Sequence, residues 1–577
     1  MGQDPTTESH RAAAAWWRSA VIYQVYVRSF ADGNGDGTGD LAGVRRRLPY
    51  LKDLGVDALW FNPWYPSPMA DGGYDVADYR DIDPAYGTLH EAEQLIAEAR
   101  DHGLRTIVDV VPNHVSDQHP WFRAALSAAP GSPSRERFWF RPGRGHAGTE
   151  PPNDWSSIFG GPAWTRTKNA DGTPGEWYLH LFAPEQPDLN WTHPLVWHEH
   201  EQILRFWFDR GAAGIRIDSA GLLVKHADLP DLDHDHAPGE HVHTDRDEVH
   251  EIYRSWRRVA DGYSEPRVLI GEIWLEDLER LARYLRPGEL HTVFNFDFLS
   301  CPWDPRRLRK SIETSLRLHD AVGAPATWVL SNHDVTRPPT RYGRADTSFA
   351  FAAKRAGTST DLELGLRRAR AAALLSLSLP GSVYIYQGEE LGLPEVEDID
   401  PERIQDPMHA RSGGVDPGRD GCRVPLPWSG DAPPYGFSPA DATGHPWLPQ
   451  PRDWGPLTVY AQRADPASTL SLYRTALRVR RAEPDLGDGP MSWIDSPPDV
   501  LAFRRGERFA CVVNLSAHPA ALPEHEEVLL SSADLDDGRL ASDAAVWLRL
   551  PDRTSGTTTN PVHLTPRRSG TEGWSTT

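Results

Sequence analysis

The sequence has little cysteine, no long apolar run and no excess of basic residues, and each absence excludes a class of protein. Only 3 of the 577 residues are cysteine, and none forms a C-x-x-C pair, which argues against zinc fingers, disulfide scaffolds and redox motifs. No window approaches the roughly 18 apolar residues of a membrane span. The first residues lack the basic stretch and apolar run of a secretory signal. We therefore expect a cytoplasmic protein that has no membrane partner.

Acidic residues outnumber basic ones by 82 to 60, so the formal net charge is −22. Such a charge disfavours nucleic acids and other polyanions as partners. Tryptophan, in contrast, is frequent, with 22 residues. Indole rings stack on sugar rings, and they also fill large cores, so this excess alone leaves both interpretations open.

Strand and helix patterns alternate along most of the chain. Helical patterns cover residues 88–103, where Thr88 and Glu91 form a capping box, and 195–210, 247–260 and 362–379. Between them lie eight apolar, β-branched runs that are typical of strands buried on both faces: 21–27, 58–61, 105–111, 214–218, 267–272, 292–298, 327–330 and 382–386. Eight such units predict an α/β fold of the (β/α)₈, or TIM-barrel, type.

Two connections are too long for a simple barrel. Residues 113–190, rich in Pro, Gly, Trp and Ser, predict a small domain inserted after the third strand, and 387–454 predict a lid-like insertion after the eighth. Short strand patterns then predict a C-terminal all-β domain, a β-sandwich, before a tail of disordered composition. The barrel is assigned to residues 16–112 and 191–482. The C-terminal domain is assigned to 483–550, and the tail to 551–577.

Polar residues at strand ends are the first candidates for chemistry, because barrel active sites lie at the carboxyl ends of the strands. Such residues follow four strands: Asp109, Asn113 and His114; Arg216 and Asp218; Glu272; and His333 and Asp334. Three carboxylates, of Asp218, Glu272 and Asp334, would therefore meet on one face. Their repulsion raises the pKa of at least one of them. One ionised nucleophile and one protonated acid are what glycoside hydrolysis requires.

Five motifs stand in order along the chain: DVVPNH (109–114), QPDLN (186–190), GIRID (214–218), GEIW (271–274) and SNHD (331–334). On these motifs the sequence closely resembles the α-amylase superfamily, glycoside hydrolase family 13, in its exo-acting α-glucosidase and oligo-1,6-glucosidase branch. The resemblance extends from about Trp16 to Leu550. It implies that Asp218 is the nucleophile, that Glu272 is the general acid and base, and that Asp334 holds the sugar hydroxyls.

The resemblance also implies a pocket that recognises the non-reducing end of an oligosaccharide. Asp75 and Arg337 are implied to pair and to close it around the O4 side of the sugar. His114 and His333 are implied to bond the glucose, and Arg216 to keep the nucleophile ionised. Tyr74 is implied to stack on the sugar. The rim residues are implied to be Phe182, Gln186 and Arg423. The ending RVPLPW departs from the RTPMQW that is more usual in oligo-1,6-glucosidases, which bears on the outer subsites.

Ser219, directly after the nucleophile, bears on which bond is cleaved. In the relatives that this chain resembles, Val at this position accompanies α-1,6 cleavage, and a small or hydroxylated residue accompanies α-1,4 cleavage. Ser219 therefore favours α-1,4, whereas QPDLN looks like the oligo-1,6 branch. The sequence thus predicts a retaining exo-α-glucosidase, a monomer or homodimer, that releases glucose from maltose and short oligosaccharides and also transfers it.

Other classes of protein that share this fold and these motifs are alternatives to the glucosidase. A sucrose isomerase or a trehalose synthase would use the same carboxylates and would differ in holding the released glucose in a closed pocket. A silent binding protein, like the heavy chains of amino-acid transporters, would carry a membrane span. A large endo-amylase is disfavoured by the closed pocket. Product analysis separates the first alternative from the glucosidase.

The segment DGNGDGTGD carries oxygen ligands at intervals that suit a hard cation, although no glutamate stands at the twelfth position of the loop. The resemblance implies a structural Ca²⁺ or Mg²⁺ there, far from the chemistry, and no organic cofactor. The oxygens belong to Asp32, Asn34, Asp36, Asp40 and the Thr38 carbonyl. A second cluster is interpreted as a surface loop rather than a metal site: His234, His236, His241 and His243.

Overall fold

A barrel of parallel strands forms the centre of the computed structural model, which describes residues 15–169, 171–232, 236–351 and 353–552. The strands pair in the order β10-β11-β1-β2-β3-β7-β8-β9, every pair parallel. The two edge strands are joined by the Thr327 hydroxyl, which donates to the Val293 carbonyl. The bounds are β1 Val21–Val25, β2 Ala58–Phe61, β3 Arg105–Val110, β7 Gly214–Ile217, β8 Val268–Gly271, β9 Thr292–Val293, β10 Thr327–Val329 and β11 Ser382–Tyr386. The predicted (β/α)₈ fold is confirmed.

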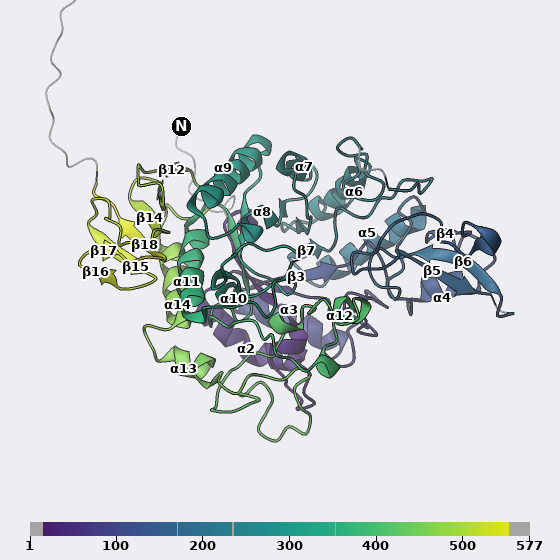
Figure 1. Cartoon of the computed structure of the whole chain (residues 1–577), viewed down its shortest axis with the longest axis horizontal. Coiled ribbons are helices and arrows are strands. Elements are labelled where there is room, and N and C mark those ends of the chain that lie inside the picture. Colours follow the sequence, from purple (N-terminus) through teal and green to yellow (C-terminus); the bar gives the residue numbers. More distant parts are fainter. Residues whose placement is uncertain (1–14, 170, 233–235, 352, 553–577) are drawn as a thin grey trace, which may run out of the picture.

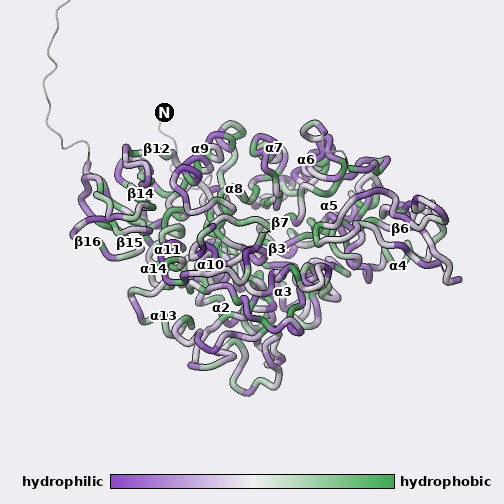
Figure 2. The backbone as a smooth tube through the Cα atoms, in the orientation of Figure 1, coloured by the Kyte–Doolittle hydropathy of each residue, from purple (hydrophilic) through white to green (hydrophobic). Residues whose placement is uncertain are grey.

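Helices surround these strands (Figure 1). Thr88 and Glu91 form the predicted capping box at the start of α3. Along the outer helices hydrophilic and hydrophobic residues alternate (Figure 2), as expected of helices that cover a core on one side and meet solvent on the other. The bounds are α2 Leu41–Leu54, α3 Leu89–Asp101, α5 Pro194–Asp209, α6 Val249–Asp261, α7 Leu278–Arg283, α9 Pro305–Val322, α10 Pro338–Tyr342, α11 Leu362–Ser378 and α14 Thr469–Ala482.

One predicted strand is much shorter in the structure. The run 292–298 forms only the two residues of β9, and α8 (Phe296–Ser300) follows it. The Asn295 side chain accepts a hydrogen bond from the Phe298 N–H and so starts this helix. The aromatic residues that suggested a long strand are buried in a helical turn instead, because an apolar run alone does not distinguish the two.

The segment between β3 and α5 contains α4 (Pro120–Ser127) and a three-stranded antiparallel sheet, β4-β6-β5, with bounds Phe140–Arg141, Pro174–Leu179 and Trp164–Lys168. Trp139, Trp155 and Trp164 lie in a hydrophobic cluster that also includes Leu229 and Val242, which come after β7 in the chain. An isolated bridge between His114 and Asp188 ties the two ends of the segment together next to the barrel. The segment after β11 contains α12 (Pro407–Arg411) and leads to α13 (Val459–Arg463).

The C-terminal part is an antiparallel sheet in the order β12-β13-β14-β18-β15. The Trp547 indole N–H donates to the Leu374 carbonyl of α11 and so joins this sheet to the barrel helices. It lies at the opposite end of the molecule from β4–β6 (Figure 1). The bounds, with those of the hairpin β16–β17, are β12 Met491–Trp493, β13 Val500–Arg505, β14 Phe509–Asn514, β15 Glu527–Ser531, β16 Leu535–Asp536, β17 Arg539–Leu540 and β18 Ala544–Arg549.

The predicted disordered tail, 551–577, lies outside the described residues apart from its first two. Among the helices that the structure describes, none has both the length and the apolar character needed to cross a membrane. The three cysteines, Cys301, Cys422 and Cys511, are free and buried.

Candidate active site

The end of β7 places two functional side chains on one face of the strand. Arg216 and Asp218 are two residues apart, so they point the same way. Nη1 of Arg216 lies 2.6 Å from Oδ1 of Asp218, and both side chains are almost completely buried. On its other oxygen, Asp218 accepts a hydrogen bond of 2.8 Å from the Ser219 hydroxyl. These two contacts hold the carboxylate in one orientation.

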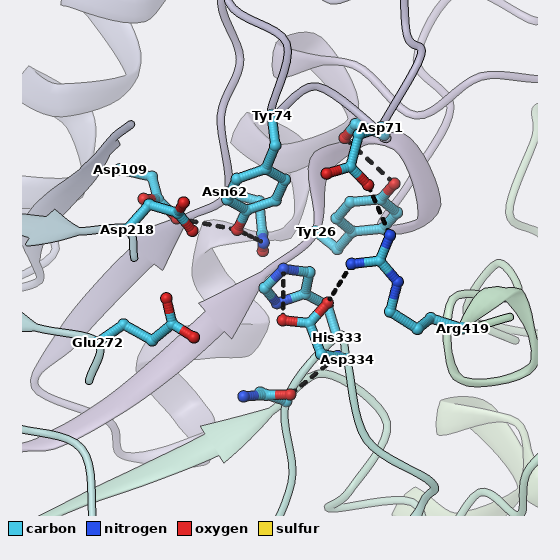
Figure 3. A network of polar contacts seen from close by, with 12 residues as sticks. Tyr26, Asn62, Asp71, Tyr74, Asp109, Asp218, Glu272, His333, Asp334 and Arg419 are labelled. Carbon is cyan, nitrogen blue, oxygen red and sulfur yellow. Dashed lines mark hydrogen bonds and ion pairs between the residues drawn. The ribbon is translucent and has the colours of Figure 1, made fainter. Parts of the chain in front are cut away.

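Glu272 follows β8 and faces the same space (Figure 3). Its Oε2 accepts the Ser219 backbone N–H at 2.7 Å and lies 3.3 Å from Nη2 of Arg216. Its Oε1 accepts the indole N–H of Trp274 at 2.7 Å. Burial raises the pKa of Glu272 to about 7; the charge of Arg216 opposes this rise and the charge of Asp218 adds to it. Near neutral pH the site therefore holds a carboxyl group that can still donate a proton.

A further buried carboxylate, Asp109 on β3, completes the surroundings of Arg216. Its oxygens lie 3.0 and 3.2 Å from Nη1 of Arg216, and it accepts the Tyr74 hydroxyl at 3.0 Å and the Trp60 indole N–H at 3.2 Å. Burial raises the pKa of Asp109 to about 8, against the charge of Arg216. Arg216 thus contacts three carboxyl groups, those of Asp109, Asp218 and Glu272.

Asp334, after β10, lies in the opposite electrostatic environment. Burial alone would raise its pKa, but the neighbouring His333 and the guanidinium groups of Arg419 and Arg423 lower it well below the usual range. Oδ1 of Asp334 lies 3.1 Å from Arg419 and 3.0 Å from Arg423, and Oδ2 lies 3.3 Å from Nε2 of His333. Asp334 is therefore ionised and suited to accept hydrogen bonds from hydroxyl groups.

An aromatic pair forms one wall of the space between these carboxylates. The rings of Tyr74 and His333 stack with centroids 5.1 Å apart and an angle of 4° between their planes. The Asn62 amide donates to the Tyr74 hydroxyl at 2.8 Å, and the Gln24 amide contacts Nδ1 of His333 at the same distance. The two rings are thus held by buried polar partners.

The pair predicted to close the pocket, Asp75 and Arg337, does not lie at the cavity, and this prediction is wrong. Asp75 is completely buried and accepts hydrogen bonds from Ser67 and from the backbone of its own loop. Arg337 precedes α10 and donates to the carbonyls of Gln387 and Cys422. The Arg337 guanidinium satisfies buried carbonyl groups, and the Asp75 carboxylate holds a turn.

An aspartate–arginine pair does lie at the cavity, formed by Asp71 and Arg419 (Figure 3). Nη2 of Arg419 is 2.6 Å from Asp71, Nε is 2.5 Å from Asp406, and Nη1 contacts Asp334. Burial raises the pKa of Asp71 to about 6, while the charge of Arg419 opposes the rise. The sequence carried one signal for this pair, an acidic and a basic residue in the glycine-rich stretches DGG and GRDG.

The inserted segment contributes the remaining wall. The Gln186 amide contacts Asp71 at 3.1 Å and Nε2 of His114 at 3.0 Å, and the Phe182 ring lies 5.0 Å from the His114 ring. The predicted rim residue Phe182 lines the cavity, whereas Gln186 supports two residues that do. Arg423 likewise acts through its contact with Asp334.

A cavity of about 290 Å³ lies between these walls. This is close to the lower end of the range for small-molecule sites, about 300–1,000 Å³. Its lining includes the charged and polar residues described above. It also includes apolar residues that were not predicted from the sequence, of which Phe159 packs on the guanidinium of Arg419: Ile158, Phe159, Leu222, Ile273, Trp274, Leu275, Phe351 and Met408.

The predicted cation loop, residues 32–40, is satisfied by its own hydrogen bonds. Asp32 accepts the N–H groups of residues 34, 35 and 37, and Asp40 accepts those of 33, 34 and 43 and caps α2. Asn34 and Asp36 accept the N–H groups of residues 36 and 38. No group of three or more His, Cys, Asp or Glu side chains among the described residues is arranged to hold a metal. The loop's oxygen donors still suit a hard cation chemically.

Part of the histidine cluster lies outside the described residues, because these exclude His234. Of the others, His236 is exposed, whereas the ring of His243 packs 4.8 Å from Trp155 in the inserted segment. Burial lowers the pKa of His243 to about 3. The structure therefore places part of this cluster in a packed position rather than in a surface loop.

Comparison with known families agrees with this geometry. The family described as "Alpha amylase, catalytic domain" matches residues 24–489. A family described as a domain of unknown function matches residues 493–547, within the C-terminal sheet.

Two curated relatives match along nearly the whole chain. A protein named "Probable alpha-glucosidase" from Rhizobium meliloti (strain 1021) is 38% identical over 531 residues, which cover 88% of this chain and 90% of that protein. An oligo-1,6-glucosidase from Parageobacillus thermoglucosidasius is 32% identical over 568 residues, which cover 90% of this chain and 95% of that one.

Solved structures of the same fold include two with different activities in their names. An alpha-glucosyl transfer enzyme is 34% identical with a TM-score of 0.78, covering 93% of this chain and 99% of its own. The trehalulose synthase of Pseudomonas mesoacidophila MX-45 is 31% identical with a TM-score of 0.79, covering 92% of this chain and 99% of its own.

Proposed function

The chain belongs to the alpha-amylase family, a family of glycoside hydrolases, and from that premise we propose that it is a retaining exo-α-glucosidase. It would release glucose from the non-reducing end of maltose and short α-1,4-linked oligosaccharides. The observation that carries the proposal is the chain of contacts from Asp71 through Arg419 to Asp334, at the cavity that also holds Asp218 and Glu272. A site closed on one side by an ion pair accommodates a chain end rather than the middle of a polymer.

The first step is attack by Asp218 on the anomeric carbon of the glucose. The bond between that carbon and the leaving oxygen breaks, and the leaving oxygen takes the proton of Glu272. A glucosyl ester of Asp218 and a carboxylate at Glu272 result. The raised pKa of Glu272 and the contact of Arg216 with Asp218 support these two roles.

The second step reverses these roles. Glu272 takes a proton from water, the water oxygen bonds the anomeric carbon, and Asp218 leaves as a carboxylate. Since both carboxyl groups contact the same guanidinium, of Arg216, and the same serine, Ser219, they lie close together. Closely spaced carboxyl groups are typical of retaining rather than inverting enzymes.

For the bond that is cleaved, the proposal is α-1,4, and Ser219 supports it. This side chain lines the cavity between Asp218 and Glu272, on the side where the second sugar would bind. Replacing Ser219 by Val would narrow that space and remove the hydroxyl. We expect Ser219→Val to raise the kcat/KM for isomaltose relative to maltose, and an unchanged ratio would contradict this role.

A second candidate function is isomerisation of a disaccharide such as sucrose or maltose. It is favoured by the similarity to a trehalulose synthase over most of both chains. The test is chromatography of the products over time, with maltose, isomaltose, sucrose and trehalose as separate substrates. Free glucose from maltose supports the glucosidase, whereas a rearranged disaccharide with little free glucose supports the isomerase.

A structural cation in the 32–40 loop is a further part of the proposal. Asp32, Asn34, Asp36, Asp40 and the Thr38 carbonyl would hold Ca²⁺ or Mg²⁺ and brace the loop before α2, with no part in the chemistry. What supports the proposal is the number of oxygen donors that the loop brings together, since a hard cation prefers such ligands. Calcium added to chelator-treated protein should raise its melting temperature, and an unchanged temperature would contradict the proposal.

A further inference from the structure

The side of the cavity that receives the leaving group is defined by what surrounds Glu272, because this residue protonates the leaving oxygen. Its carboxylate is held by Ser219 and Trp274. Leu222 and Leu275, close in sequence to these two residues, line the same cavity, and so does Phe351. The Phe351 ring lies edge-on to Trp274, with 4.7 Å between centroids. These five residues form the leaving-group side.

Polar side chains on this side are already engaged. The Ser219 hydroxyl donates to Asp218 at 2.8 Å, and the Trp274 N–H donates to Glu272 at 2.7 Å. Thr244, which also lines the cavity, has its hydroxyl 3.1 Å from the His243 ring. Among the described residues that line this side, only the catalytic pair is charged, and the Ser219 and Thr244 hydroxyls and the Trp274 N–H are already bonded to protein atoms.

The glucose side has the opposite character. There the ionised Asp334, the Asp71–Arg419 pair and the ring nitrogens of His114 converge on the same cavity. A glucose ring exchanges its water for these partners. A second sugar on the leaving-group side, such as the second glucose of maltose, finds fewer charged partners for its hydroxyl groups and is bound less favourably than the first glucose.

A flat apolar wall makes up most of the leaving-group side. Trp274 stacks on Phe296 with 3.7 Å between ring centroids and 5° between planes, which holds the indole in place. Leu222, Leu275 and Phe351 extend the apolar surface from three different loops. Apolar rings gain from burial against such a surface in proportion to the area removed from water.

We propose that the leaving-group side selects alcohols that carry an apolar ring, so that the enzyme transfers glucose to such alcohols in preference to sugars. This inference rests on the proposed function, since it concerns the second step of the same reaction. The acceptor oxygen bonds the anomeric carbon of the glucosyl–Asp218 ester, the ester bond breaks, and the acceptor proton goes to Glu272. The product is the α-glucoside of the alcohol.

The test uses α-glucosyl fluoride as donor, because fluoride needs no leaving-group subsite. Cyclohexanol and glucose, which share a six-membered ring and secondary hydroxyls, compete as acceptors at equal concentration. We expect cyclohexyl α-glucoside to exceed the disaccharides by about tenfold, the lower end of what one apolar contact contributes to discrimination. Disaccharides in equal or larger amount would overturn the inference.

Two variants that add polar groups to the wall, Leu275→Gln and Phe351→Asn, should shift the ratio towards the disaccharides. The matched control is Val415→Gln, since Val415 is 87% exposed and does not line the cavity. If a variant releases fluoride at the normal rate and its ratio of cyclohexyl α-glucoside to disaccharides is unchanged, the inference is overturned. If neither variant releases fluoride, the inference is judged by this product ratio in the unmodified enzyme.

The two proposals fail in different ways in this experiment. If neither fluoride is released from the donor nor glucose from maltose, the proposed function fails. If both are released and glucose is the better acceptor, only the inference about the leaving-group side fails.

Discussion

At the scale of single residues, the site depends on how the Arg216 guanidinium is shared among carboxyl groups. Arg216 contacts three carboxyl groups, and it cannot neutralise all of them. Asp218 has the shorter contact, 2.6 Å against 3.3 Å for Glu272, and Glu272 keeps the raised pKa. The nucleophile thus has the shortest contact with the guanidinium, and the acid is a carboxyl group at the cavity whose pKa burial raises.

The activity should decrease as the pH rises through about 7, because Glu272 must be protonated for the first step. The Trp274 N–H stabilises the ionised form of Glu272. Trp274→Phe should therefore raise the pKa of Glu272 and move the alkaline limb of the kcat/KM profile up by about one pH unit. A lower rate with an unmoved limb would show that Trp274 has only a packing role.

Replacing Arg419, the cation between Asp71 and Asp334, should strongly reduce the activity. Arg419→Ala leaves Asp71 buried without its cation, whereas Asp334 and Asp406 keep Arg423, and breaking one buried pair costs about 3–5 kcal/mol. We expect kcat/KM for maltose to decrease by at least about 100-fold. Arg403→Ala, an exposed arginine of the same segment, is the control. Equal rates in the two variants would contradict the role of Arg419.

The catalytic residues could be predicted from the sequence because they lie at strand ends, where the barrel fixes their direction. The wrong prediction of Asp75, instead of Asp71, as the pocket residue shows where prediction from the sequence fails. Both stand in one loop, and the turn at Gly72 and Gly73, with φ of 57° and 104°, decides which side chain reaches the cavity. Residue spacing does not reveal such a turn. In the same way, the apolar wall comes from loops that are far apart in the sequence.

At the scale of elements, a buried lysine joins the inserted segment to the barrel. Nζ of Lys225, in the loop after β7, lies 2.7 Å from Asp188 and 2.6 Å from Oδ1 of Asn113, at the two ends of the inserted segment. Asp188 also accepts the Leu181 N–H. This contact orients the segment that carries Phe182 and Gln186 towards the cavity.

Lys225→Met should loosen the inserted segment, since it leaves Asp188 buried and unpaired, at a cost of about 3–5 kcal/mol. Hydrogen exchange at the Leu181 amide should become faster, and kcat/KM should decrease as the wall moves. Lys168→Met, at an exposed lysine of β5, is the control. Protection of the Leu181 amide equal to that of the control would contradict this account.

Strands could be predicted closely where both faces are buried, as in β2 and β11, whose bounds match the apolar runs. At β9 the prediction was wrong because a cap, Asn295, starts a helix within the apolar run. Local hydrogen bonds of this kind compete with the strand pattern.

At the scale of the whole molecule, buried titratable groups set the pH range of stability. Burial raises the pKa values of Glu272, Glu389 and Glu395 to about 7 and that of Asp109 to about 8. Their stabilising contribution is complete below the unfolded pKa and is lost as the pH rises through these values. Burial lowers the pKa values of His119, His180 and His200 to about 4, so their contribution is lost as the pH falls from about 6.5.

Above pH 6.5 the histidine contribution is complete and the carboxyl contribution is still being lost, so the melting temperature should decrease from pH 6.5 towards pH 8. Glu389→Gln should reduce this decrease, because Glu389 no longer ionises. An exposed acid such as Glu524, replaced by Gln, is the control. A melting temperature that rises between pH 6.5 and pH 8 would contradict the assignment.

The central claim is that Asp218 and Glu272 carry out a retaining hydrolysis of α-glucosides. The most direct test is proton NMR of the glucose first formed from maltose, recorded before the anomers interconvert. The account predicts that α-glucose appears first. First-formed β-glucose, or a rearranged disaccharide without free glucose, would contradict it.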